Sequence, residues 1–177
     1  DINELKQRLE PYEKFHRIGF KPLGFVRGTM SVTGTNNILI VEGSLAKYFM
    51  KNNIDNFHWK YVKPAIKMLS AELGLPVERG QLRRIDVAGN LCVAEPVINY
   101  FPELRHLNYY GKRNKKTTLR FESNQQTENI LFYDKLAEAK KGKIQDADTF
   151  GKKWKNLLRY EVQMQRRIAP KLGFSKV

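Results

Sequence analysis

The second half of the chain repeatedly alternates apolar and polar residues with a period of two, the pattern of a β-strand with one buried face. The alternation is clear over residues 81–93 and returns over 157–165, and residues 107–110, 117–121 and 129–133 are shorter strand-like runs. These segments predict a mainly antiparallel central sheet of about five strands. With helices packed on one face of that sheet, the fold class is α+β.

The helices are predicted mostly from the first half of the chain. Residues 1–15 have a helical pattern interrupted at Pro11, and Ser44 is a suitable cap for a helix that ends near Met50. Apolar residues at helical spacing predict a longer helix over 57–73, ending at Gly74. Residues 23–32 and 38–41 predict two strands joined by a turn, and 95–104 and 134–141 predict short helices.

We expect a single domain of residues 1–177, in which residues 1–20 form a helical N-terminal extension, because no linker or repeat divides the chain. No run approaches the ~18 apolar residues that a membrane span needs. The one cysteine, Cys92, lies in an apolar run and is predicted to be a core residue.

The net charge of +14 comes from 32 Lys and Arg against 18 Asp and Glu, and the basic residues are interleaved with aromatic ones along the chain. The charge therefore belongs to the folded surface and favours a polyanionic partner such as nucleic acid. A basic protein without a specific polyanionic partner is the other interpretation.

Two strand-like runs share an arrangement of arginine, apolar residue, acid and apolar residue, with Arg84 and Asp86 in one and Arg159 and Glu161 in the other. In each run the arginine and the acid share a face. They are either exposed ion pairs, which contribute ~0–1 kcal/mol, or two carboxylates that converge across neighbouring strands and bind a hard divalent cation. Glu42, at the end of a third apolar run, is either another oxygen ligand or simply an acid near a helix N-terminus.

Tyr133 ends the apolar run 130–132 and precedes a charged helix start. A phenolic oxygen can attack a phosphodiester and hold the broken strand covalently, although a tyrosine in this position is also a common core residue with its hydroxyl at the rim. Lys135 could orient the phosphate or protonate the leaving oxygen if the backbone stays extended there. A helix that begins at Asp134 would turn the lysine away, and a solvated lysine is the alternative.

A basic cluster next to two tyrosines is suited to phosphates and stacked bases, although an ordinary solvated loop has the same composition. The cluster consists of Lys112, Arg113, Lys115, Lys116 and Arg120 beside Tyr109 and Tyr110, and the other candidate nucleic-acid-binding residues are Arg84 and Arg159.

Four ordered segments, 41–47, 84–86, 131–138 and 158–161, carry a resemblance that extends over about residues 38–167. The chain resembles the rolling-circle replication initiators of phages and plasmids, the class that includes the filamentous-phage gene-two protein. It is most similar to members from Bacteroidetes elements, and the wider superfamily is that of the HUH nicking enzymes.

The resemblance implies that Tyr133 nicks one strand of DNA at an origin, keeps the 5′ phosphate as a phosphotyrosine and leaves a 3′ hydroxyl. It also implies Mg²⁺ or Mn²⁺ as the cofactor. The His-hydrophobic-His pair of the superfamily is missing, so Asp86, Glu161 and Glu42 are the expected ligands. The expected partners are single-stranded origin DNA associated with a hairpin, together with a host helicase and polymerase in the bacterial cytoplasm.

Two other functions fit the same residues. A non-catalytic module for single-stranded nucleic acid would bind without a covalent product, and a metal-dependent hydrolytic nuclease would release both DNA ends free. The sequence leaves open whether the parent element is a phage, a plasmid or an integrated element.

Overall fold

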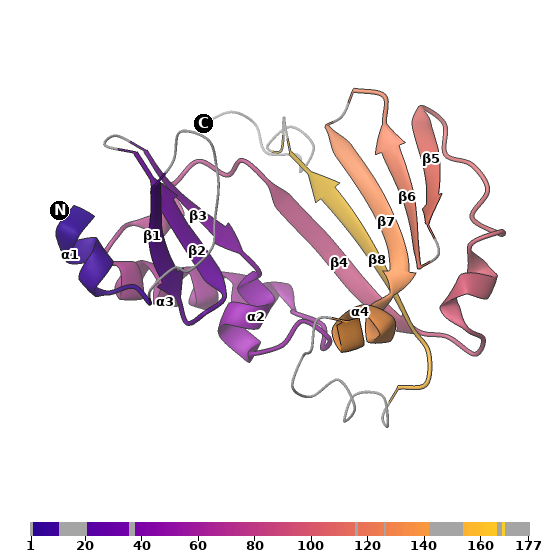
Figure 1. The fold of residues 1–177 in the computed structure, drawn as a ribbon, viewed down its shortest axis with the longest axis horizontal. Helices are drawn as coiled ribbons and strands as arrows, with labels where there is room; N and C mark the ends of the chain where they lie inside the picture. The colour runs from indigo at the N-terminus through magenta and orange to yellow at the C-terminus, as the bar shows by residue number, and fades with distance from the viewer. Residues whose placement is uncertain are drawn as a thin grey trace. The chain divides into compact units, whose positions relative to one another are not determined.

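The computed structural model describes residues 2–10, 21–35, 38–115, 117–125, 127–141, 154–165 and 168. The fold is α+β with a five-stranded antiparallel sheet, as predicted from the alternating runs (Figure 1). The chain forms two compact units, Asp1–Gly80 and Gln81–Val177. The single-domain prediction for 1–177 remains a prediction. None of the described helices is long and apolar enough to cross a membrane.

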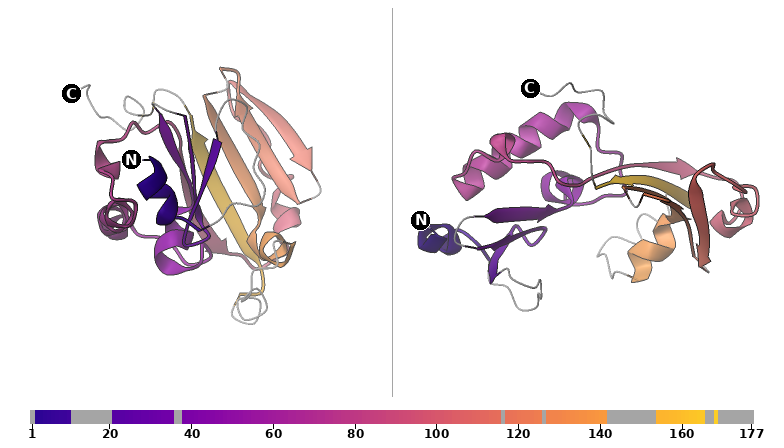
Figure 2. Two further views of the ribbon diagram at one scale, coloured as in Figure 1. Left: turned by 60° about the vertical axis from the view of Figure 1, so that its left-hand side comes forward. Right: turned by 90° about the horizontal axis from the view of Figure 1, so that it is seen from above.

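The first unit contains a three-stranded antiparallel sheet in the order β1-β2-β3. Its elements are α1 (Ile2–Gln7), β1 (Lys21–Val26), β2 (Met30–Gly34), β3 (Leu39–Gly43), α2 (Leu45–Met50), η1 (Trp59–Tyr61), α3 (Val62–Leu73) and η2 (Val77–Arg79). Helix α3 lies over the sheet (Figure 2), and its buried residues Leu69 and Leu73 pack with Val32 of β2 and Tyr48 of α2. Of the predicted N-terminal extension 1–20, residues 11–20 lie outside the described residues.

Local chemistry explains where these helices begin and end. The hydroxyl of Ser44 accepts a hydrogen bond from the Lys47 N–H at 3.3 Å, which caps α2 as predicted. Gly74 ends α3 in the left-handed conformation, with φ of 67°, which glycine adopts without strain. The prediction of one strand over 23–32 is wrong, because Arg27 and Gly28 both have positive φ and form the turn between β1 and β2.

The second unit is built around the larger sheet, whose strand order is β4-β8-β7-β6-β5 with every neighbour antiparallel. Its elements are β4 (Ile85–Cys92), η3 (Val97–Tyr100), β5 (Tyr110–Lys115), β6 (Thr118–Ser123), β7 (Glu128–Asp134), α4 (Lys135–Lys141) and β8 (Leu157–Met164). The acids Asp86 and Glu161 of the two similar segments therefore belong to β4 and β8, which are neighbours as the metal hypothesis requires, and Arg84 directly precedes β4.

Three local predictions in this unit differ from the structure. The strand expected over 107–110 instead begins at Tyr110 and runs to Lys115. The short helix expected over 95–104 is a single 3₁₀ turn. Cys92 is exposed and is not a core residue, because it is the last residue of the outermost strand β4.

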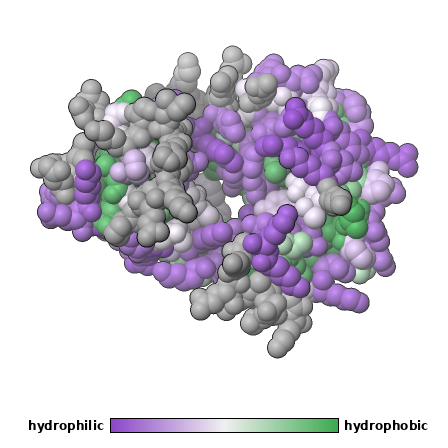
Figure 3. Space-filling view, in the orientation of Figure 1, coloured by the Kyte–Doolittle hydropathy of each residue, from purple (hydrophilic) through white to green (hydrophobic). Residues whose placement is uncertain are grey.

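The two faces of the larger sheet differ in chemistry. One face is apolar. Its residues Leu119, Phe121 and Leu158 pack with Val97 of η3 and with Phe101, which directly follows η3. The strand register places the alternate residues on the other face, which we call the polar face. It carries Asp86, Ala88 and Asn90 of β4, Arg159, Glu161 and Gln163 of β8, Asn129, Leu131 and Tyr133 of β7, Thr118, Arg120 and Glu122 of β6, and Gly111, Arg113 and Lys115 of β5. Hydrophilic side chains predominate over much of this sheet in Figure 3.

Candidate active site

Tyr133 lies near the end of β7, on the polar face and directly opposite Arg159 of β8. Its hydroxyl donates a hydrogen bond of 3.3 Å to Oε2 of Glu161. Burial raises the pKa of the Tyr133 hydroxyl above its usual range; the charges of Glu161 and Glu138 and the Glu161 hydrogen bond add to this, and Arg159 opposes it. The phenol is therefore protonated at neutral pH, with a carboxylate in place to receive the proton.

The carboxylate of Glu161 is held by three donors. Besides Tyr133, Nε of Arg159 reaches Oε2 at 3.4 Å and Nε2 of Gln163 donates to Oε1 at 2.7 Å. Arg159 is fixed in turn by a 3.2 Å bond from Nη1 to Oδ1 of Asn90. The side chains of Arg159 and Glu161 are only 14% and 13% exposed, so this pair is screened less than an open surface pair. The alternative of a simple exposed ion pair does not describe it.

Asp86 lies on the same face, directly opposite Gln163 and on the strand next to Glu161. Arg84 binds both of its carboxylate oxygens, at 2.8 and 2.7 Å. Within the described part of the chain, no three His, Cys, Asp or Glu side chains come together as a metal site. Two carboxylates with the amide oxygen of Gln163 are nevertheless donors of the kind that Mg²⁺ and Mn²⁺ prefer.

Glu42, the third predicted ligand, belongs to the other compact unit. It is an exposed residue of β3, opposite Ser31 of β2. The structure does not group it with Asp86 or Glu161, and its role as a ligand remains a prediction.

Lys135 begins α4 and does not continue the extended backbone of β7. Its side chain is only 1% exposed, and Nζ pairs with Oε2 of Glu138 at 2.5 Å. The backbone therefore does not stay extended at Lys135, because Asp134 caps the helix by accepting bonds of 2.9 Å from the N–H groups of Leu136 and Ala137. A contact between Lys135 and a phosphate would require the lysine to leave its ion pair.

The predicted basic cluster is divided by the strand register. Arg113 and Lys115 of β5 lie on the polar face with Tyr133. Lys112 lies on the opposite face, where Nζ donates to the Leu104 carbonyl at 2.8 Å and lies over the ring of Phe121. Lys116 lies outside the described residues.

The two tyrosines next to this cluster have different surroundings. Tyr109 is 82% exposed, which leaves its ring available for stacking. Tyr110 packs against the apolar core, and its hydroxyl donates to Glu128. Tyr109 is thus the better placed of the two for contact with a base.

Gln163 on the polar face was not among the predicted site residues, whereas Arg120 belonged to the predicted basic cluster. Gln163 is one of the few buried polar side chains, and its position two residues after Glu161 on the same face was the available signal. Nε of Arg120 is buried and has no hydrogen-bond partner among the described residues, although Nη1 pairs with Glu122 at 3.4 Å. The Arg120 side chain is 40% exposed, and a guanidinium that has a donor without a partner is suited to an oxyanion such as phosphate.

A family model for the N-terminal part of the replication-associated gene-two protein matches residues 25–177. The chain belongs to this family. Searches of curated proteins and of solved structures found no match. Membership in the gene-two N-terminal family makes the chain a rolling-circle replication initiator like the filamentous-phage protein, and it confirms the family resemblance carried by the four sequence segments. The match includes every strand of the larger sheet.

Proposed function

We propose that this initiator nicks and rejoins one strand of origin DNA with Tyr133 as the nucleophile. The observation that carries the proposal is the contact between the Tyr133 hydroxyl and Glu161 on a polar sheet face, in a chain of the gene-two N-terminal family. The tyrosine oxygen attacks phosphorus, the bond to the 3′ oxygen breaks, and the 5′ phosphate stays on Tyr133. The strand is left with a 3′ hydroxyl that a host polymerase, aided by a helicase, can extend.

The proton balance of the step involves Glu161. The pKa of Tyr133 is raised by burial, so the hydroxyl must give up its proton as it attacks. Oε2 of Glu161, at 3.3 Å, is the acceptor, and the departing 3′ oxygen takes a proton from solvent. Gln163 and Arg159 keep the carboxylate turned toward the phenol, because each donates to it.

The phosphate is bound by cations of the polar face. Arg120 has an unfilled, buried donor and lies opposite Leu131, two residues before Tyr133 on β7. Arg113 and Lys115 on the next strand extend the positive charge along the DNA backbone. These basic residues of the polar face suit the negative charge of single-stranded origin DNA, with a hairpin beside the nick. Lys135 can contact the phosphate only if its ammonium group leaves the ion pair with Glu138.

The residues that would hold Mg²⁺ or Mn²⁺ are Asp86 and Glu161, with Gln163 as a neutral oxygen donor, and Glu42 remains a predicted third ligand. When bound, such an ion would polarise the scissile phosphate and offset the charge that develops on it. Arg84 competes for the same oxygens of Asp86, since it binds both of them. Metal binding at Asp86 would therefore weaken its pair with Arg84.

The test is covalent capture of an oligonucleotide with the origin sequence in Mn²⁺ buffer, analysed on a denaturing gel. A 3′ label should move with the protein, while a 5′ label should appear on a shorter strand that a polymerase can extend. Tyr133→Phe should give no covalent band but should still bind DNA. Tyr160→Phe is the matched control, since Tyr160 is on the opposite face of the same sheet. Normal nicking by Tyr133→Phe would remove Tyr133 from the mechanism.

The same gel separates the two other functions. Intact substrate with salt-sensitive binding would indicate a module for single-stranded nucleic acid without catalysis. Two free fragments without a covalent band would indicate a hydrolytic nuclease.

A further inference from the structure

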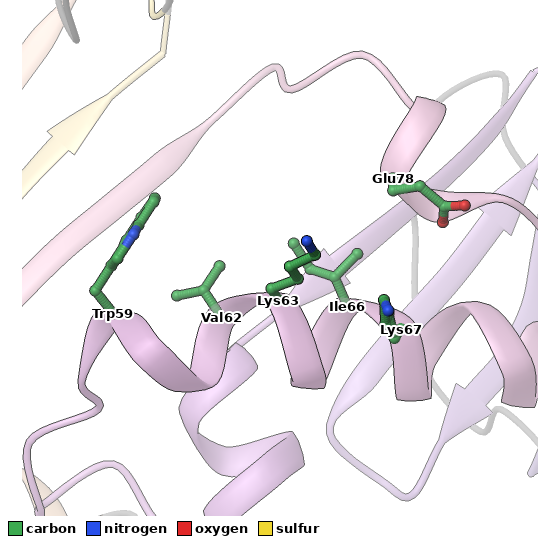
Figure 4. Close-up of a pocket in the computed structure, with 6 residues that line it drawn as sticks. All are labelled: Trp59, Val62, Lys63, Ile66, Lys67 and Glu78. Atoms are coloured by element: carbon green, nitrogen blue, oxygen red, sulfur yellow. The ribbon is translucent and has the colours of Figure 1, made fainter.

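An exposed tryptophan lies beside a groove on α3, in the first compact unit. Trp59 is 77% exposed, although tryptophan is a residue that folded proteins usually bury. It lines a groove of about 440 Å³ together with Val62, Lys63, Ile66, Lys67 and Glu78 (Figure 4). None of these residues takes part in the site around Tyr133.

The groove has an apolar floor and a positive rim. Val62 and Ile66 are half-buried and one helical turn apart, while Lys63 and Lys67 are exposed and lie on the same side of the helix. Lys63 and Lys67 are about 6 Å apart along the helix axis. The two lysines face outward because Ala65 and Leu69, on the opposite side of the helix from them, are buried in the core.

One acidic residue, Glu78, lies at one end of the groove and lowers the positive charge there. Glu78 accepts a hydrogen bond of 2.8 Å from the Ser70 hydroxyl, and hydrogen bonds from its own backbone N–H and from Ser70 lower its pKa. It therefore stays ionised and repels an anion at that end. A polyanion is attracted to the part of the groove that carries Trp59, Lys63 and Lys67.

We propose that this groove is a second contact for single-stranded DNA, in which a base stacks on Trp59 and the flanking phosphates pair with Lys63 and Lys67. The inference rests on the proposed function only in taking single-stranded DNA as the partner. Stacking on an exposed ring tolerates any base, so the contact holds the strand without reading its sequence. The chain thus has a contact for DNA that does not involve the nucleophile itself and that retains the strand while the phosphodiester is exchanged.

The experiment follows the fluorescence of Trp59. The chain has two tryptophans, so a Trp154→Phe/Tyr133→Phe protein reports on Trp59 alone and cannot form the tyrosine adduct. An oligothymidine of about 15 nucleotides should quench its emission, because the base stacks on the indole. Trp59→Ala in the Tyr133→Phe protein should weaken binding of the same labelled strand, measured by anisotropy, by about fivefold or more.

The lysines are tested by the salt dependence of binding. Lys63→Ala/Lys67→Ala should reduce the slope of log K against log salt by about 1.4, since each phosphate contact in a single strand contributes ~0.7. The control is Lys6→Ala/Lys155→Ala, which removes the same charge from exposed positions elsewhere. Unchanged Trp59 emission with DNA bound, or an equal loss of slope in the control, would overturn the inference.

The outcome is independent of the nicking chemistry. A covalent band from the wild-type chain with no response from Trp59 would leave the proposed function intact and reject the groove. Quenching of Trp59 without any covalent band would support the groove as a DNA contact and reject the proposed nicking function.

Discussion

Asp134 is the residue that turns the chain from β7 into α4, directly after the proposed nucleophile. Its Oδ1 accepts from two N–H groups at 2.9 Å, those of Leu136 and Ala137, so Asp134→Ala removes both partners at once. Loss of such a cap costs about 0.5–2 kcal/mol, and loss of the negative charge at the helix start adds about 0.3–1 kcal/mol. For a chain of this length, we expect the melting temperature to fall by roughly 2–8 °C.

The matched control is Asp134→Asn, which keeps the capping oxygen and loses only the charge. The free energy of unfolding is measured by urea titration, and amide hydrogen exchange at Leu136 and Ala137 reports on the cap itself. Both amides should exchange faster in Asp134→Ala than in Asp134→Asn. Covalent adduct formation by Tyr133 should fall in the alanine variant and recover in the asparagine variant. Equal destabilisation by the two substitutions would refute the capping argument.

Two further predictions concern carboxylates on the two faces of the larger sheet. Asp86→Ala and Glu161→Ala should each lose metal-dependent adduct formation. The control Glu128→Gln, on the apolar face of the sheet, should retain it. Full activity of both alanine variants in Mn²⁺ would reject Asp86 and Glu161 as ligands. Burial, with the hydrogen bond and the negative charge of Glu128, raises the pKa of Tyr110 to about 12, while an unfolded tyrosine loses its proton near pH 10. Tyr110 therefore stabilises the fold below about pH 10 and loses this effect as the pH rises toward 12. The stability gap between wild type and Tyr110→Phe should narrow from pH 9 to 11 in urea titrations, and a constant gap would contradict this.

The larger sheet could be predicted because its central strands alternate strongly in polarity. The run 157–165 was recognised by its period and became β8, Leu157–Met164, at the middle of the strand order next to β4 and β7. Strand β5 was displaced in the prediction because its residues Gly111–Lys115 are all exposed, so no apolar alternation marks them. The hairpin within 23–32 was missed because its turn residues Arg27 and Gly28 are short of a strong turn signal and lie between the apolar residues Val26 and Met30.

The candidate site was predictable in residue type but only partly in arrangement. The sequence indicated that Asp86 and Glu161 would share a sheet, and the register places them on one face of adjacent strands. It did not indicate that Arg84 occupies both oxygens of Asp86, or that Lys135 is buried against Glu138, because both depend on side-chain packing. Gln163 was overlooked because its position two residues after Glu161 indicates the face of the strand but not that a neutral amide there will be buried.

Strand β5 is the last strand on its side of the larger sheet, so one row of its backbone N–H and C=O groups has no neighbouring strand among the described residues. An exposed edge strand of this kind can pair with a strand from another chain, and charged side chains such as lysine and arginine on the edge strand commonly prevent this. Lys112, Arg113 and Lys115 give β5 three like charges within four positions. Two copies of the chain approaching through these margins would repel each other, so the charge that attracts a polyanion also guards against aggregation.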